Sequence, residues 1–135
     1  MKINNFLVAG LLGLSLTACQ AMKPQMQEVG TLNSEQLHAL FVNKTVESNN
    51  LNNYEVSYTF YMDNGQVIQQ RSGNIRTGQW KINSKGKICL KMENKGFGCR
   101  YVVRKGDEYF KYRRNKEGNF APIIRYGTFV SGKNF

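Results

Sequence analysis

The feature that most constrains the fold is a series of short segments, beginning at Tyr54, in which apolar and polar residues alternate. In the first of them, one face carries Tyr54, Val56, Tyr58, Phe60 and Met62, and the other carries Glu55, Ser57, Thr59 and Tyr61. A period of two is typical of a half-buried β-strand, because successive side chains point to opposite faces. Asn64 and Gly65 follow, and this pair favours the tight turn of a hairpin. The pattern therefore predicts a β-hairpin over residues 54–71.

Further strand-like segments follow this hairpin, each bounded by turn residues. They span residues 74–82, 87–93, 99–104 and 108–114. A last apolar segment contains Pro122, which predicts an edge strand or an irregular one because proline has no N–H to donate. Strands separated by turns at intervals of roughly 8 to 12 residues are typical of sandwiches and barrels. We therefore expect a mainly β fold, a small antiparallel up-and-down barrel or sandwich of six or seven strands.

One short helix is predicted ahead of the strands. Leu37, Leu40 and Phe41 recur at helical spacing, and Asn33 or Ser34 can cap the N-terminus of a helix that ends near Asn43. We interpret its apolar stripe as part of the core. His38, beside that stripe, is interpreted as structural because no partner for catalysis is close to it in sequence.

The first twenty residues resemble the lipobox signal sequence of bacterial lipoproteins. Lys2 precedes an apolar stretch over residues 6–16, which is too short to span a bilayer, and the segment closes with Leu16-Thr-Ala-Cys19. The resemblance implies cleavage before Cys19, lipid on its sulfur, and, with Gln20 next, anchoring in the outer membrane facing the periplasm. An uncut signal anchor and an ordinary signal peptide are the alternatives. We expect a signal peptide at 1–18, a lipidated Cys19 and flexible tether at 19–33, and one β-rich domain at 34–135.

The two remaining cysteines, Cys89 and Cys99, form an even pair in an exported chain, which predicts a disulfide. A hairpin about Asn94 would place them opposite each other. A metal site or a nucleophile is the weaker alternative, because His38 is the only histidine and lies far away in sequence. We expect no metal and no cofactor.

The positive charge is concentrated in the second half of the chain. The net charge is +10, and the stretch from Arg71 to Arg125 holds fifteen Lys or Arg against four acidic residues. In an exported protein this excess favours an envelope polyanion over nucleic acid, namely lipopolysaccharide, phospholipid headgroups or peptidoglycan. The alternative is that these cations only solvate strand faces. The candidate anion-binding residues, which alternate with aromatic residues, are Arg100, Arg104, Lys111, Arg113, Arg114 and Arg125.

Several motifs of the exported part occur in an order that resembles an uncharacterised family of small exported proteobacterial domains. The matching residues are 37–45, Thr77-Gly-Gln-Trp80, Gly86, Cys89, Cys99 and Val103-Arg-Lys-Gly-Asp107. The resemblance implies a lipocalin-like small barrel and no settled activity. A Gly-x-Trp strand is also similar to that of calycins, in which the tryptophan closes one barrel end, so Trp80 is interpreted as a core residue.

The sequence predicts a protein that is not an enzyme. It has no Ser/His/Asp arrangement and no glycine-rich phosphate loop between a strand and a helix. Two hypotheses follow. One is a non-enzymatic, membrane-anchored binding module for an envelope polyanion. The other is a structural or assembly accessory that docks on another envelope protein.

Overall fold

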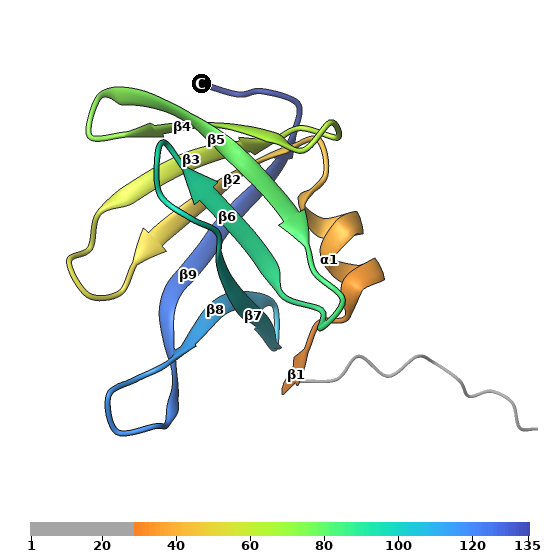
Figure 1. Cartoon of the computed structure of the whole chain (residues 1–135), viewed down its shortest axis with the longest axis vertical. Helices are drawn as coiled ribbons and strands as arrows, with labels where there is room; N and C mark the ends of the chain where they lie inside the picture. The colour runs from red at the N-terminus through yellow and green to blue at the C-terminus, as the bar shows by residue number, and fades with distance from the viewer. Residues whose placement is uncertain (1–28) are drawn as a thin grey trace, which may run out of the picture.

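The computed structural model describes residues 29–135, which form a β-barrel with one helix (Figure 1). The nine strands of this part of the chain are β1 (Val29–Thr31), β2 (Lys44–Asn50), β3 (Val56–Tyr61), β4 (Gln66–Arg71), β5 (Asn74–Ile82), β6 (Ile88–Met92), β7 (Gly98–Lys105), β8 (Glu108–Arg114) and β9 (Phe120–Ser131). The helix α1 (Ser34–Phe41) lies between β1 and β2.

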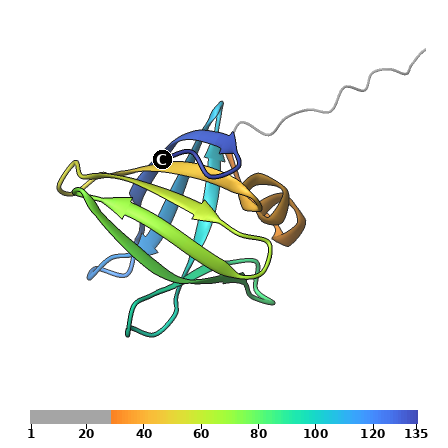
Figure 2. The same cartoon turned by 90° about the horizontal axis from the view of Figure 1, so that it is seen from above.

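Eight of these strands close into a ring. Each of β2 to β8 pairs antiparallel with the strand that follows it, and β9 pairs with both β8 and β2. Figure 2 shows the strands curving around a common axis with α1 beside one end. The mainly β class and the barrel architecture are thus confirmed, whereas the expected count of six or seven strands is too low.

Helix α1 begins where the sequence predicts. Asn33 is the N-cap, and its side chain and that of Gln36 form a capping box, with each accepting a hydrogen bond of 2.9 Å from the other's backbone N–H. Leu37 and Phe41 are fully buried. The ring of Phe41 packs edge-on against Tyr61 at 5.0 Å between centroids, so the helix covers an apolar end of the barrel.

Trp80 belongs to the same apolar end, as the Gly-x-Trp motif predicts. The indole is buried, its Nε1 donates a hydrogen bond of 2.7 Å to the carbonyl of Met62, and its ring meets Tyr61 edge-on at 5.3 Å. His38 lies outside it, with its ring centroid 6.5 Å from that of Trp80. This exposed histidine therefore has a packing contact with the residue that fills the barrel end.

The two faces of β3 are the reverse of what hydrophobicity suggests. Ser57, Thr59 and Tyr61 are buried and point into the barrel, whereas Val56 and Tyr58 lie on the exposed outer surface. The inward residues of the neighbouring strands at this level, Ser48 and Gln69, are polar as well. The barrel therefore has an apolar half under α1 and a polar half at the opposite end.

Two strands lie where the sequence predicted none. The β2 segment ends in Ser48-Asn-Asn50, whose strand propensity is low, and its inward Ser48 faces the polar half of the barrel. The short β1 pairs with the second half of β7, and the next residue, Leu32, is buried in the core. Residues 29–32, which the sequence assigned to the end of the tether, are therefore packed against the barrel.

Pro122 lies in a strand with partners on both sides, but only where the local pairing is irregular. It is opposite Tyr112, next to a register shift in the β8–β9 pairing, and β2 pairs with β9 only from Ile124 onward. The missing N–H of proline therefore breaks no ladder on the β2 side. The predicted signal peptide, Cys19 and most of the predicted tether lie outside the described residues.

Candidate anion-binding groove

The ladder between β7 and β8 closes the barrel over only part of its length, and it does not include the start of β7 or the end of β8. The two strands pair from Tyr101 to Lys105 on β7 and from Glu108 to Tyr112 on β8. Before this ladder, β7 pairs only with β6, and after it β8 pairs only with β9. The backbones diverge there and leave a groove of about 580 Å³ on the side of the molecule.

The residues that line this groove are cationic and aromatic. They are Lys87, Cys99, Arg100, Tyr101, Tyr112, Arg113, Arg114 and Phe120, and they are called the β7–β8 groove below. Four of the eight carry a positive charge, and none of these described lining residues is acidic. A concave surface lined by charge of one sign concentrates its electrostatic potential, so the potential in the groove is expected to be positive.

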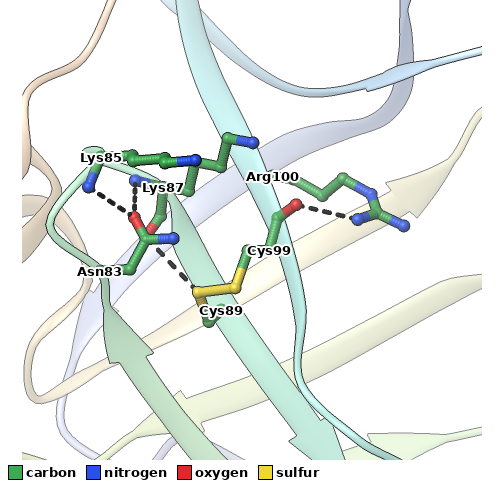
Figure 3. Close-up of a disulfide and its surroundings, with 6 residues drawn as sticks. All are labelled: Asn83, Lys85, Lys87, Cys89, Cys99 and Arg100. Carbon is green, nitrogen blue, oxygen red and sulfur yellow. Dashed lines mark hydrogen bonds between the residues drawn. A yellow bond between two sulfur atoms is a disulfide. The ribbon is translucent and has the colours of Figure 1, made fainter.

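The disulfide Cys89–Cys99 fixes one wall of the groove. The two cysteines are direct partners in the β6–β7 ladder, with their Cα atoms 4.0 Å apart, as the hairpin about Asn94 predicts. Figure 3 shows this bond with Lys87 and Arg100 nearby. The side-chain oxygen of Asn83 accepts hydrogen bonds from the backbone N–H groups of Lys85 and Lys87, at 3.0 and 2.9 Å, which orders the turn leading to Lys87.

Aromatic rings hold two of the cations in place. The Lys87 ammonium lies 4.8 Å from the ring centroid of Tyr101, and the Arg114 guanidinium lies 4.4 Å from that of Phe120. These two rings meet each other edge-on at 6.1 Å. The Arg114 guanidinium also donates a hydrogen bond of 2.6 Å from Nη1 to the carbonyl of Gly118, which leaves its other N–H donors for a second ligand. The aromatic pair thus presents both positive charges on one surface.

An apolar pocket continues from the groove along the outer face of β7. It has a volume of about 340 Å³, and Tyr101, Tyr112 and Phe120 line both spaces, while Thr31, Val103 and Lys105 line the pocket alone. Tyr101 and Val103 point outward together with Cys99, which explains why these apolar residues do not share a face with the inward Ile88. The cationic groove therefore continues directly into a mostly apolar pocket, and the two share three aromatic residues.

Three of the six candidate anion-binding residues meet in the groove, namely Arg100, Arg113 and Arg114. The other three lie elsewhere. Arg125 is on the outer face, 3.3 Å from the carboxylate of Glu108, and Arg104 donates a hydrogen bond of 2.7 Å to the carbonyl of Gly106 beside the β7–β8 turn. Lys111 faces the barrel interior, since its ladder partner is the buried Val102.

The environment of Lys111 disfavours a positive charge. Burial and, to a smaller extent, the nearby Arg100 guanidinium lower the pKa of the Lys111 ammonium to about 8. Arg100 therefore contributes its charge both to the groove and to the barrel interior.

Lys87 and Phe120 line the groove but belong neither to the six candidate cations nor to the disulfide nor to the aromatic residues that alternate with those cations on β7 and β8. For Lys87 a signal was present, because pairing Cys89 with Cys99 places Lys87 opposite Tyr101 when the register is extended by two residues. For Phe120 there was no such signal, because its position depends on the irregular β8–β9 register.

Within residues 29–135, no group of three or more His, Cys, Asp or Glu residues is placed to hold a metal ion. No helix in this part of the chain has the length and hydrophobicity needed to cross a membrane. Comparison of the chain with protein families, with characterised proteins and with solved structures finds no match. The resemblance to small exported domains and to bacterial lipoproteins therefore stays a prediction.

Proposed function

We propose that this protein is a lipid-anchored, non-enzymatic binding module of the bacterial envelope that takes a phosphorylated headgroup in the β7–β8 groove. The observation that carries the proposal is the groove itself, in which four cations and three aromatic rings line one concave surface without an acidic residue. The envelope polyanions that match this chemistry are lipopolysaccharide and anionic phospholipids, with peptidoglycan as a further candidate.

The donor geometry suits phosphate oxygens. Guanidinium groups present paired N–H donors that bind phosphate through two parallel hydrogen bonds, and three arginines contribute to the groove. Tyr101, Tyr112 and Phe120 add flat apolar faces on which a sugar ring or a glycerol backbone can pack. A lipid headgroup can use both the cations and the aromatic faces of the groove, whereas a simple salt ion can use only the cations.

The position of the apolar pocket supports a ligand that belongs to a membrane. Thr31, at the start of the folded domain, lines this pocket and lies twelve residues after Cys19 in sequence. Twelve residues span at most about 40 Å even when fully extended. A lipid on Cys19 would therefore hold the pocket and the groove close to the bilayer surface, where acyl chains and headgroups are both available.

Vesicle binding by the soluble form, residues 29–135, tests the proposal. Binding is measured by sedimentation against vesicles that contain lipopolysaccharide or phosphatidylglycerol, and against neutral phosphatidylcholine vesicles, at low and physiological salt. We expect binding only to the anionic vesicles and weakening with salt, because screening acts on exposed charges. Equal binding to neutral vesicles, or no binding to either, would contradict the proposal.

Matched variants separate the groove from general positive charge. One carries Arg100→Gln, Arg113→Gln and Arg114→Gln; the control carries Lys81→Gln, Lys95→Gln and Lys133→Gln, which are exposed cations outside the groove. At about 1 kcal/mol per cation near an anionic surface, we expect the groove variant to bind roughly a hundredfold more weakly. An equal loss in the control would show that binding depends on net charge alone.

The alternative function, a structural accessory that docks on another envelope protein, is favoured by one observation. The outer faces of β3, β4 and β5 carry neighbouring apolar residues, and Ile75 among them is 57% exposed. If this face binds a protein, crosslinking in intact envelopes gives a stoichiometric product that Ile75→Glu removes. A product that persists in the Ile75→Glu variant would rule out this face.

A further inference from the structure

The polar half of the barrel encloses a small cavity that is separate from the β7–β8 groove. Its volume is about 100 Å³, and its walls include Ser48, Ser57, Thr59, Gln69 and Lys111. These residues come from β2, β3, β4 and β8, so the cavity reaches across the barrel. A space of this size is much smaller than the roughly 300 Å³ at which pockets for larger ligands begin, and corresponds to about three water molecules.

The charges around the cavity do not balance. Among the described residues that line it, Glu55 is the only acid, and it is already engaged by Arg71 at 3.6 Å and by the hydroxyl of Ser72. Lys111 has no carboxylate or hydrogen-bond partner in the described part of the chain, and the guanidinium of Arg100 acts on it as a like charge. The interior therefore contains an uncompensated positive charge.

Two further buried donor groups of the barrel interior are also unsatisfied, although neither of them lines the cavity. The Nε of Arg76 and the hydroxyl of Tyr126 lack a hydrogen-bond partner among the described residues. Arg76 adjoins the cavity through Gln69, whose side-chain oxygen accepts a hydrogen bond from its guanidinium. Tyr126 lies toward the apolar half, where its ring packs edge-on against Phe41 at 5.2 Å. A buried donor without a partner typically costs 1 to 3 kcal/mol, so such groups call for an acceptor.

The polar wall is held in a defined orientation. Gln69 accepts from Arg76 through its oxygen and donates a hydrogen bond of 2.9 Å from Nε2 to the hydroxyl of Thr59. The Arg76 charge thus fixes the amide, and the amide fixes Thr59. These linked hydrogen bonds hold the polar side chains in a fixed orientation opposite the ammonium of Lys111.

We propose that the polar half of the barrel is a binding site for one small oxyanion, held by Lys111 and the hydroxyl and amide groups of β3 and β4. Phosphate and the carboxylate of a short organic acid share the required chemistry, because each offers several acceptor oxygens and negative charge in a volume of this size. The site goes beyond the headgroup proposed for the β7–β8 groove, and its test does not depend on membrane binding.

The experiment uses the full chain, labelled with ¹⁵N and purified in a non-ionic detergent. Sodium phosphate, acetate or succinate is added at constant ionic strength, and the side-chain amide signals of Gln69 and the backbone signals of Ser57 and Thr59 are followed. We expect saturable shifts of these signals with at least one of the three anions. The three arms distinguish an inorganic oxyanion from a carboxylate.

Variants assign the response to the cavity. Lys111→Met and Lys111→Gln, which keeps a polar group, are both expected to weaken anion binding at least tenfold. The triple groove variant, Arg100→Gln with Arg113→Gln and Arg114→Gln, removes one neighbouring cation and is expected to keep the saturable Gln69 response. Unchanged Gln69 signals with all three anions, wild-type affinity in both Lys111 variants, or shifts confined to groove residues such as Lys87 would each overturn the proposal.

Discussion

Replacing Lys111 by methionine is expected to raise the stability of the barrel at neutral pH. Lys111 carries its charge inside the barrel beside Arg100, and burial together with that guanidinium lowers its pKa from 10.5 to about 8. Methionine is of similar length and apolar, so it can occupy the same path between the strands without a charge. The substitution therefore removes a cost without opening a large cavity.

The magnitude follows from the pKa difference between the unfolded and the folded chain. Below pH 8 the ammonium is protonated in both states, and the unfolded state binds this proton more tightly, so folding carries the full penalty. At 1.36 kcal/mol per pKa unit, the difference corresponds to about 3 kcal/mol as an upper bound. Because Lys111 is partly exposed, water screens its charge, and we expect about 1 to 3 kcal/mol.

The sign of the pH dependence is a sharper test than the magnitude. Between pH 8 and 10.5 the unfolded chain holds more protons at this site than the folded chain, so the wild-type protein gains stability as pH rises. Other charged groups around the cavity, Glu55, Arg71, Arg76 and Arg100, are common to both proteins. The stability advantage of Lys111→Met should therefore be largest at pH 7 and should shrink toward pH 10.

The assay is urea unfolding of both proteins at pH 7 and at pH 9.5, followed by circular dichroism. Lys95→Met is the matched control, because Lys95 is exposed in the turn between β6 and β7. We expect its effect on the free energy of unfolding to be the same at both pH values. If Lys111→Met were destabilising at pH 7, or if its effect did not change with pH, the assignment of a costly buried charge would be wrong.

Three further predictions concern the elements that hold the site. Asn33→Ala removes the hydrogen bond that the Asn33 side chain accepts from the Gln36 backbone N–H, and should lower the free energy of unfolding by about 1 kcal/mol in urea titrations, whereas no change would show that this cap contributes nothing. The double variant Cys89→Ala and Cys99→Ala should lose about 2 to 3 kcal/mol by the same titration, because the disulfide closes a short loop, and it should bind anionic vesicles more weakly because Cys99 forms a wall of the β7–β8 groove. Trp80→Ala should cost about 3 to 5 kcal/mol, measured by thermal unfolding, since it removes the buried ring that packs on Tyr61 under α1; a loss below 1 kcal/mol would contradict its role in closing that end.

Much of the fold could be predicted from local pattern. The hairpin at Asn64-Gly65, the capped helix and the Cys89–Cys99 pairing depend on residues close in sequence, and the structure confirms all three. Strand β2 could not be found this way. Its polar inward Ser48 is tolerated only because the opposite walls of the barrel are polar too, and that is a property of the closed ring.

The residues of the candidate site could likewise be predicted only in part, because their positions also depend on how the ring closes. The charge excess pointed to β7 and β8, which line the groove, yet alternation along β8 places Lys111 inside the barrel and Arg114 outside it. The groove itself arises because the β7–β8 ladder stops at Tyr101 and Tyr112, and no single-strand pattern marks that position. Lys87 joins the groove across the disulfide-linked pair of strands, so it is found only once the register is known.

The most direct test of the central claim is residue-resolved NMR of ¹⁵N-labelled residues 29–135 titrated with bicelles containing phosphatidylglycerol. We predict that the signals of Lys87, Arg100, Tyr112 and Arg113 shift first and saturate together, and that neutral bicelles leave them unchanged. Shifts centred instead on the outer face of β3 to β5, around Tyr58 and Ile75, or spread over all exposed lysines, would contradict the assignment of the β7–β8 groove as the binding site.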